Sequence, residues 1–379
     1  MSSLFSRGTF MKLQRIQIHS FRNIINAELV PGERFNIIVG NNAQGKTNIL
    51  EAIFLLGTMK SFRMVKNADL ISYGSPFSLI KGWGVRDKVV REISLSIGDS
   101  GKKAFVDQKP VVRPADFFGT INTVVFSPED ISMVRGLPEM RRRYLDRAIF
   151  SGDTGYLSIH HEYFKILKNR NALLKSGNSD GLSVWTEQLA DAGARLMEKR
   201  ETFIEEIQEL FREYYRSIAG QEEYAFLRYR SRISEKDRSR SSLRDALCHA
   251  LEKSFPEELR RGTTLLGPHR DDLECSLNDR PLHHHGSQGE QRSFILALKM
   301  AEIEYLRKRW GNPPVLLLDD MTSELDRNRS GNLMDFLNEK DMQVFITTTS
   351  IDTINLVGIK NYSTFPVHDG KVLAEVTNV

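Results

Sequence analysis

The stretch Gly40-Asn41-Asn42-Ala43-Gln44-Gly45-Lys46-Thr47 decides the fold of this 379-residue chain. It follows a strand-like segment, 34–39, and precedes apolar residues at helical spacing, 46–56. A glycine-rich turn between a strand and a helix directs consecutive backbone N–H groups at one phosphate cluster, and the helix adds its positive end. We therefore expect all eight residues to form a nucleotide phosphate loop, with Lys46 at the β and γ phosphates and the Thr47 hydroxyl on Mg²⁺. The alternative is a chance match in a glycine turn.

Val315-Leu316-Leu317-Leu318-Asp319-Asp320 predicts the metal-binding part of the same site. Four consecutive aliphatic residues are typical of a parallel strand that is buried on both faces. Asp319, at the end of that strand, would bind Mg²⁺ directly or through water. Asp320 would polarise the attacking water, so Asp320 and Lys46 are the expected catalytic residues. Adjacent carboxylates are also common as solvated charges, but their place after a buried strand favours function.

Ser287-Gln288-Gly289-Glu290-Gln291, the SQGEQ segment, precedes a strongly apolar helix that extends to Gly311. A serine and a glycine at the start of a helix are frequent N-cap residues, and taken alone that interpretation prevails. The position shortly before Asp319 and Asp320 instead favours a functional interpretation. In it, Ser287, Gly289 and Gln291 cap a nucleotide that a second subunit holds.

In the order of these motifs, the chain resembles the SMC group of ABC-type ATPases, and more narrowly the RecF family of bacterial recombination mediators. The resemblance covers residues 11 to about 370. Further segments also carry it: Ser20-Phe21-Arg22-Asn23, Lys60-Ser61-Phe62-Arg63, Phe126-Ser127-Pro128-Glu129-Asp130, Asn169-Arg170-Asn171-Ala172-Leu173-Leu174-Lys175, Gly267-Pro268-His269-Arg270-Asp271-Asp272, Ser323-Glu324-Leu325-Asp326 and Val344–Thr349.

The resemblance implies an α/β fold, an ABC-type P-loop ATPase head with an inserted, mostly helical second lobe. It implies ATP and Mg²⁺ as cofactors and a homodimer that forms on ATP and separates after hydrolysis. Asp326 would lie along the dimer seam, and Thr348 or Thr349 would replace the γ-phosphate-sensing histidine of ABC proteins. The segment 126–130 is the expected equivalent of the metal-facing glutamine loop, although it contains no glutamine. Asp320 in place of a glutamate base implies a slow, DNA-stimulated ATPase.

The same resemblance implies a role in DNA replication, DNA repair, recombination and the SOS response to DNA damage. Such a protein would bind single-strand gaps or their duplex junctions, act with RecR and RecO, and promote RecA loading. A cytoplasmic, nucleoid-associated location is expected. Two unrelated cysteines, Cys248 and Cys275, fit a reducing compartment, and no apolar run approaches the roughly 18 residues of a membrane span.

Three segments are expected along the chain: 11–138 and 261–379 as the two parts of the ATPase head, and 139–260 as a helical arm. The stretches 140–175 and 184–218 lack proline and favour two long antiparallel helices. The second has an apolar stripe at Trp185, Leu189, Ala192, Leu196, Phe203, Ile207, Leu210, Tyr214 and Ile218. A strand, 224–231, and a helix, 241–254, follow, and residues 273–279 are expected to lead back to the head.

Basic residues gather in the segment 226–244, and five are candidate contacts to DNA phosphates: Arg228, Arg230, Arg232, Arg238 and Arg240. A solvated charged face is the alternative for them, and also for Arg141-Arg142-Arg143, which would otherwise face DNA, the nucleotide or the arm base. His269 has a structural alternative as well, in a pair with Asp271 or Asp272. His283-His284-His285 lack neighbouring ligands at metal spacing, so a metal site there is disfavoured.

Three other classes of protein remain as alternatives. An ABC transporter subunit is disfavoured by the SQGEQ segment and by the long insertion between Lys46 and Asp319. A chromosome-organising SMC relative would need much longer coiled coils than about 35 residues per helix. A nucleotide-binding scaffold without hydrolysis would retain the same motifs.

Overall fold

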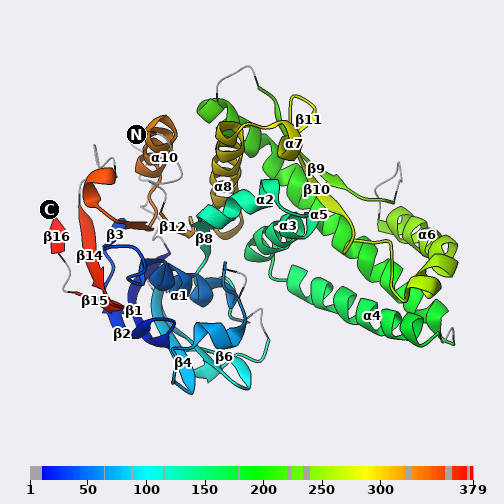
Figure 1. Ribbon diagram of the computed structural model, residues 1–379, viewed down its shortest axis with the longest axis horizontal. Coiled ribbons are helices and arrows are strands. Elements are labelled where there is room, and N and C mark those ends of the chain that lie inside the picture. Colours follow the sequence, from blue (N-terminus) through cyan, green and yellow to red (C-terminus); the bar gives the residue numbers. More distant parts are fainter. Residues whose placement is uncertain are drawn as a thin grey trace, which may run out of the picture. The chain divides into compact units, whose positions relative to one another are not determined.

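The computed structural model describes residues 11–63, 65–86, 89–113, 116–177, 180–219, 223–233, 240–320, 327–354, 361–373 and 376–378 (Figure 1). The chain divides into two compact units. The first unit contains Met1–Asp130 and Ile295–Val379, and the second contains Ile131–Phe294. The α/β fold with an inserted, mostly helical part is as expected.

The first unit contains two sheets. One is antiparallel with strand order β2-β1-β4-β5-β6-β7. Its strands are β1 (Lys12–Phe21), β2 (Ile24–Leu29), β4 (Phe77–Arg86), β5 (Val89–Gly98), β6 (Gly101–Val106) and β7 (Lys109–Pro110). The other sheet has the order β15-β14-β3-β13-β12-β8, with β16 on β14. Its strands are β3 (Phe35–Val39), β8 (Thr123–Phe126), β12 (Val315–Leu318), β13 (Val344–Thr348), β14 (Tyr362–His368), β15 (Lys371–Val372) and β16 (Val376–Asn378).

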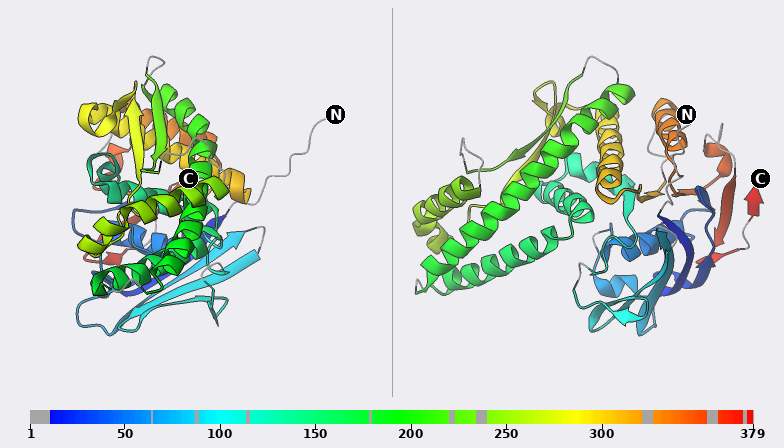
Figure 2. Two further views of the ribbon diagram at one scale, coloured as in Figure 1. Left: turned by 90° about the vertical axis from the view of Figure 1, so that its right-hand side faces the viewer. Right: turned by 180° about the vertical axis from the view of Figure 1, so that it is seen from behind.

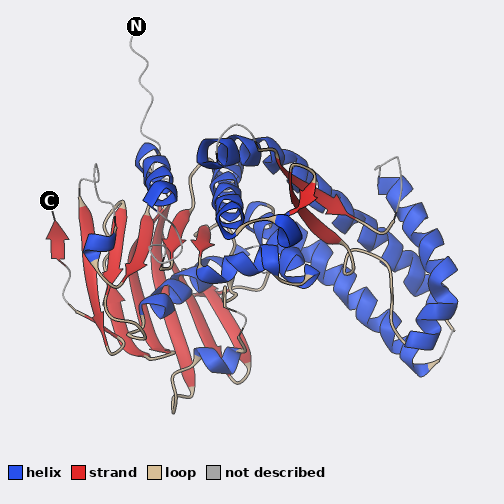
Figure 3. Cartoon of the chain, turned by 45° about the horizontal axis from the view of Figure 1, so that its top comes forward, coloured by secondary structure: helices blue, strands red, loops and turns tan. Residues whose placement is uncertain are grey.

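The strands β8, β12, β13, β3 and β14 are mutually parallel, so their carboxyl ends lie at one edge of the sheet (Figure 3). Residues 40 and 319 directly follow two of these strands. The topology therefore brings the predicted phosphate loop, residues 40–47, and the paired aspartates to one edge, where doubly wound α/β sheets bind their ligands.

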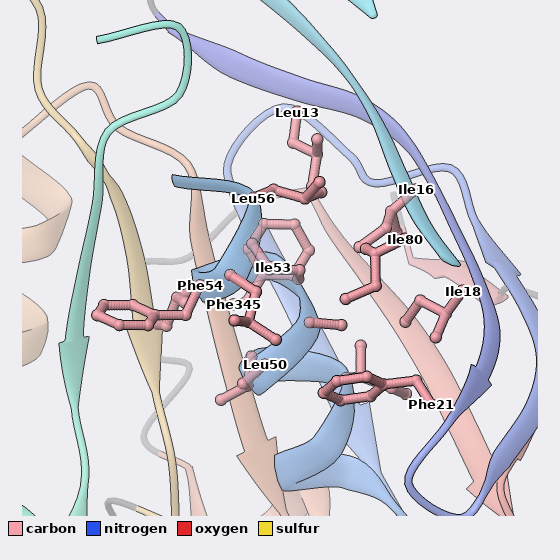
Figure 4. Packing of buried hydrophobic residues seen from close by; sticks show 14 of the residues in the cluster. Leu13, Ile16, Ile18, Phe21, Leu50, Ile53, Phe54, Leu56, Ile80 and Phe345 are labelled. Atoms are coloured by element: carbon pink, nitrogen blue, oxygen red, sulfur yellow. The ribbon is translucent and has the colours of Figure 1, made fainter. Parts of the chain in front are cut away.

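Helix α1 (Lys46–Thr58) is buried on nearly every side because it lies between the two sheets of the first unit. Figure 4 shows Ile53 and Leu56 of α1 beside Leu13 and Ile80 of the antiparallel sheet, and Phe345 of β13 belongs to the same core. This packing fixes the amino end of α1, where the phosphate loop ends. The other helices described wholly within this unit are η1 (Asn67–Leu70), η3 (Pro128–Asp130), α10 (Arg327–Glu339) and η4 (Ile351–Thr353).

The second unit is mostly helical. Its helices are α2 (Ile131–Arg135), α3 (Pro138–Gly152), α4 (Tyr156–Ser176), α5 (Leu182–Ala219), α6 (Arg240–Arg261) and α7 (Leu282–His285), and α8 (Gln288–Trp310) begins here and continues into the first unit. α4 and α5 lie side by side as the expected antiparallel arm (Figure 2). Arg170 of α4 pairs with the buried Glu258 of α6 over 2.7 Å and donates to Thr186 of α5, which ties the three helices together.

Two details of the arm differ from the sequence-based expectation. The stretch 140–175 is not one helix, because it breaks at Asp153, whose Oδ1 accepts a hydrogen bond from the Gly155 backbone N–H. The apolar stripe of α5 also shifts near its carboxyl end: Phe211 and Tyr215 are fully buried against Phe294, whereas Leu210, Tyr214 and Ile218 are only half-buried. A stripe at strict heptad spacing drifts around a straight helix, which explains the shift by one residue.

The strand at 273–277 also differs from its expected place. It is β10 (Asp272–Leu277), and it pairs with β9 (Ala225–Arg230) and β11 (Arg280–Pro281) in a three-stranded sheet of the second unit. Residues 261–294 thus lie in the second compact unit and not with the remainder of 261–379. The functional domain boundaries at 138 and 260 stay a prediction. Among the described helices, none has the length and apolar composition that a bilayer crossing requires.

Candidate nucleotide site

The phosphate loop bridges β3 and α1 in the first unit. Gly40 lies so close to β14 that a Cβ atom would stand 2.4 Å from the carbonyl oxygen of Val367, so only glycine fits there. Gly45 has a φ of 110°, a conformation that glycine adopts without strain. Two hydrogen bonds fix Gln44 to the turn after β14. Its Oε1 accepts from the Asp369 N–H at 2.5 Å, and its backbone carbonyl accepts from the Gly370 N–H at 2.9 Å.

The remaining loop residues leave the outer side of the loop open. Asn41, Asn42 and Ala43 are exposed. The Lys46 ammonium is nearly buried and donates to the carbonyl oxygens of Gly40 at 2.6 Å and of Asn41 at 2.7 Å. Burial lowers the pKa of Lys46, against the opposing effect of Asp320 and Asp319. A partly desolvated cation within a turn of backbone N–H groups suits a polyphosphate.

Asp319 forms hydrogen bonds with residues of helix α1 and of the strands β13 and β8. Its Oδ1 accepts hydrogen bonds from the hydroxyls of Thr47 and Thr347, each at 2.8 Å. Its backbone N–H donates to the carbonyl of Phe126 at 2.9 Å, which places the segment 126–130 beside it. Burial raises the pKa of Asp319, and the nearby charges of Glu129 and Asp320 add to that rise. A buried carboxylate in this state favours the approach of a cation.

Asp320 and Thr348 flank this cluster. Asp320 has a φ of 48°, in the left-handed region that aspartate tolerates, and its N–H donates to the Thr347 hydroxyl at 2.9 Å. The sharp turn lets Asp320 diverge from the buried Asp319. Thr348 is buried; its hydroxyl donates to the carbonyl of Ser350 at 2.8 Å, and its own carbonyl accepts from the Gly40 N–H at 3.2 Å. Thr348 therefore supports the loop, while Thr349 is exposed.

The oxygen donors at this edge fit Mg²⁺. A threonine hydroxyl and a carboxylate are hard ligands, and Mg²⁺ in nucleotide sites takes one or two protein oxygens while phosphates and water supply the others. Within the described part of the chain, no group of three or more His, Cys, Asp or Glu side chains could hold a metal ion. That finding includes His283, His284 and His285, which lie in α7.

A polar network around Glu51 was not recognised in the sequence. Glu51 lies on α1, one turn after Thr47, and is fully buried. Arg22 donates to both of its carboxylate oxygens, at 2.9 and 3.0 Å, and Ser61 donates a short hydrogen bond to it. Arg63 approaches Glu51 to 4.0 Å and donates to Asn48 at 3.2 Å. Glu51 stands among apolar residues in the sequence of α1, and this isolated charge was the sequence signal that could have indicated a buried ion pair.

The SQGEQ segment lies in the second unit, at the amino end of α8. The Ser287 N–H donates to the Glu290 carboxylate at 2.5 Å, and the Glu290 N–H donates to the Ser287 hydroxyl at 3.2 Å. This is a capping box, so the N-cap interpretation of Ser287 holds in the single chain. Gly289 is partly exposed, whereas Gln291 is buried and bonded to Arg135 and to the Gly286 carbonyl.

The structure divides the basic candidates. Arg228, Arg230 and Arg232 are exposed on and just after β9, while Arg240 forms an ion pair with Asp191 at 3.1 Å. In the run Arg141-Arg142-Arg143, Arg141 is buried and bonds both oxygens of Asp272, Arg142 donates to the carbonyl of Asp271, and Arg143 pairs with Glu139. Arg141 and Arg142 therefore serve the base of the arm.

His269 does not pair with Asp271 or Asp272. Its Nδ1 is 2.7 Å from the Tyr163 hydroxyl, and its Nε2 is 3.2 Å from the carbonyl oxygen of Thr264. Because a carbonyl only accepts, Nε2 carries the proton and Nδ1 accepts from Tyr163. Burial lowers the pKa of His269 to about 4, so the ring is neutral. Two other sequence candidates, Asp326 and Arg238, lie outside the described residues.

Comparison with known proteins adds relatives along nearly the whole chain. The family model described as "RecF/RecN/SMC N terminal domain" matches residues 12–372. The DNA replication and repair protein RecF of Geotalea uraniireducens is 56% identical over 363 residues, which are 96% of this chain and 100% of the relative. That of Geobacter metallireducens is 58% identical over 362 residues, with 96% and 99% covered.

Solved structures agree with this similarity. One described as the recombination mediator protein RecF-ATPrS in the RecFOR pathway superposes with a TM-score of 0.89 at 33% identity, and covers 96% of this chain and 98% of that one. A RecF-ATP structure of the same pathway gives 0.88 at 33% identity, with 97% and 99% covered. The Smc head domain from Pyrococcus furiosus, at 15% identity and a TM-score of 0.54, shares the fold alone.

Proposed function

Since the chain belongs to the RecF family of the RecF/RecN/SMC ATPases, we propose that it is an ATP-driven dimer that acts on DNA as a recombination mediator. The observation that carries the proposal is the set of contacts at the sheet edge. Lys46, Thr47 and Asp319, from the two ends of the chain, meet there through direct hydrogen bonds or electrostatic interaction. These residues form a half-site: they would contact the phosphates of ATP from one side and leave the other side uncovered.

The second side of the nucleotide would come from another copy. Ser287 and Gly289 stand at the amino end of α8, where the helix dipole favours an anion. The γ-phosphate would then join the two copies, and its loss by hydrolysis would let them separate, because ADP offers the second copy less to bind. Asp326 would lie along this seam.

The residues around the triphosphate have separable roles. Lys46 would leave its two carbonyl partners and bind the β and γ phosphates. Thr47 and Asp319 would hold Mg²⁺, which neutralises phosphate charge when bound. Asp320 would orient and polarise the attacking water. A carboxylate base and a neutral Thr348 in place of a sensing histidine support slow turnover, which DNA would stimulate.

DNA is the proposed substrate surface and the RecFOR pathway the proposed setting. Relatives named for DNA replication and repair and a solved recombination mediator of that pathway support this role. The protein would bind single-strand gaps or duplex junctions, cooperate with RecR and RecO, and so promote RecA loading. ATP hydrolysis would time its release, and its place would be the cytoplasm, at the nucleoid.

Sedimentation with ATP, ADP or no nucleotide, each with and without gapped duplex DNA, tests this function. We expect dimers with ATP, most of all on gapped DNA, and no dimers of a Lys46→Ala variant. An Asp320→Asn variant should dimerise with ATP but release no phosphate in the steady state, which separates an ATPase from a scaffold. A nucleotide-loaded Asp320→Asn protein that stays monomeric at high concentration on gapped DNA would refute the proposal.

A further inference from the structure

A chain of hydrogen bonds inside the second unit holds the turn that begins the SQGEQ segment. The Gln291 side chain donates to the carbonyl oxygen of Gly286 at 2.9 Å, directly before Ser287. The Oε1 atom of the same amide accepts from Nε of Arg135 at 2.6 Å. Gln291 is only 5% exposed, so its amide must be satisfied by protein groups, and Arg135 does so. Arg135 therefore stands two hydrogen bonds from the Gly286 carbonyl.

Arg135 is itself anchored. It is the last residue of α2, which ends where the Gly136 N–H donates to the carbonyl of Ser132 at 2.7 Å. The Gly136 carbonyl accepts from Arg141 at 3.0 Å, and Arg141 bonds both oxygens of Asp272 at 2.8 Å. A bidentate arginine–carboxylate pair is among the most directional contacts in proteins. The turn that carries Arg135 is thus fixed relative to β10.

The charge of Arg135 has no acidic counterpart in the described residues. Its one contact there is the neutral Gln291 amide, which engages only Nε. The nearby Glu290 carboxylate accepts from the Ser287 N–H instead, within the capping box. Arg135 is exposed, so both Nη groups remain available beside the amino end of α8. An exposed guanidinium that is held through Nε beside a helix amino end is a binding arrangement for a phosphate oxyanion.

From this geometry we propose that Arg135 belongs to the half-site of the SQGEQ segment and binds the polyphosphate of a nucleotide held by a second copy of the chain. The inference rests on the proposed ATP-dependent dimer and adds a residue to it. Nε keeps the Gln291 amide and the Gly286 turn in place, and the Nη groups face the incoming phosphate. Arg135 therefore acts on the partner's nucleotide and not on the one bound to its own Lys46.

An Arg135→Met variant tests the first part of this inference in the full chain. With ATPγS and Mg²⁺ we expect self-association to weaken about tenfold or more, the loss usual for a hydrogen bond to a charged group. Binding of a fluorescent ATP analogue to the dilute monomer should not change. Arg143→Gln, which removes an exposed charge paired with Glu139, is the matched control and should dimerise as the parent does.

Mixing two defective variants tests whether Arg135 acts in trans. Arg135→Met keeps its Lys46, and Lys46→Ala keeps its Arg135, so a mixed dimer contains one complete composite site. At a concentration where each variant alone is mostly monomeric, we expect the labelled mixture to form dimers. A parallel mixture of Ser287→Arg with Lys46→Ala sets the level that one composite site supports, and the Arg135→Met mixture should reach it.

Two results would overturn the inference while leaving the dimer intact. One is an Arg135→Met protein that dimerises with ATPγS as well as the parent does. The other is a mixture with Lys46→Ala that stays below the Ser287→Arg benchmark, since Arg135 would then act within its own subunit. Failure of the parent protein itself to dimerise would instead refute the proposed function.

Discussion

Thr47 and Asp319 stand 272 positions apart in the chain, and the Thr47 hydroxyl donates a hydrogen bond to Oδ1 of Asp319 over 2.8 Å. The contact joins the first turn of α1 to the end of β12, two elements on one edge of a parallel sheet. Because Thr347 donates to the same oxygen, the carboxylate is oriented before any ligand arrives. Preorganisation of this kind reduces the cost of binding, since the ligand need not fix the side chain.

Asp319→Asn is expected to separate stability from function. Burial raises the pKa of Asp319, so the charged form is disfavoured in the folded protein without a cation. The neutral amide can still accept from Thr47 and Thr347, and we expect an unchanged or higher melting temperature without nucleotide. Mg²⁺-dependent ATP binding should weaken about tenfold or more, as is usual when a metal site is altered. Titration with ATP, with and without Mg²⁺, measures this.

The exposed Asp335 of α10 offers a matched change, because Asp335→Asn removes the same charge away from the site. It should leave both quantities as they are in the parent. Equal ATP affinity of Asp319→Asn and the parent at limiting Mg²⁺ would exclude Asp319 as a metal ligand.

The pair Arg22–Glu51 is expected to be a major source of stability for the first unit. Removing one partner of a buried ion pair costs about 3 kcal/mol or more, because the other charge stays buried without compensation. Glu51→Ala should therefore shift urea unfolding strongly, and adding Arg22→Ala should cost less than the sum of the single changes. The exposed pair Lys12–Glu33 is the control, with under about 1 kcal/mol expected. Additive losses in the double variant would contradict the coupling.

The loop from Gly40 to Thr47, the strand that ends before Asp319 and the helix before that strand could be predicted because each is encoded locally. Glycine spacing, an apolar strand and a helical pattern are visible within a few residues of one another. The Arg22–Glu51 pair is of another kind. Arg22 lies in the segment 20–23 and Glu51 in the helix expected over 46–56, and no local pattern in the sequence indicates that these two segments pack together.

The errors in the arm have a similar origin. Asp153 and Gly155 form a turn that contains no proline, and β10 pairs with β9, a strand distant in the sequence. The N-cap role of Ser287 was correctly foreseen as one alternative. The predicted contact of Ser287 with a nucleotide on a second subunit depends on the dimer, and no local sequence pattern encodes that assembly.

His269 is expected to make folding sensitive to acid. Its pKa is lowered by burial to about 4, against about 6.5 in an unfolded chain. Between pH 6.5 and 4 the unfolded chain binds more protons than the folded one. The free energy of unfolding is therefore unaffected by His269 above pH 6.5 and decreases as the pH drops towards 4. The total loss from this residue is about 3 kcal/mol. Thermal unfolding of the parent and of His269→Gln from pH 7.5 to 4.5 measures it.

In His269→Gln the amide can replace the contacts to Tyr163 and Thr264 but does not titrate. The variant should therefore lose part of the steepness below pH 6.5, although its stability at pH 7.5 need not match the parent. Parallel pH curves for the two proteins would show that His269 does not carry the dependence.

The exposed arginines of β9 are expected to bind DNA phosphates. Arg228 and Arg230 alternate along one side of the strand, Arg232 follows, and no described carboxylate forms an ion pair with any of them. Replacing all three by Gln should weaken DNA binding and lower the slope of log K against log salt by about 2.7, at about 0.9 for each lost phosphate contact to duplex DNA. The base sequence of the DNA should not affect binding, because phosphates carry no sequence information.

A control of equal charge replaces Arg143, Arg260 and Arg261, which already pair with Glu139 or Glu257 in the same unit. Equal salt slopes for the two triple variants would place the DNA contacts elsewhere, since net charge alone would then explain the loss.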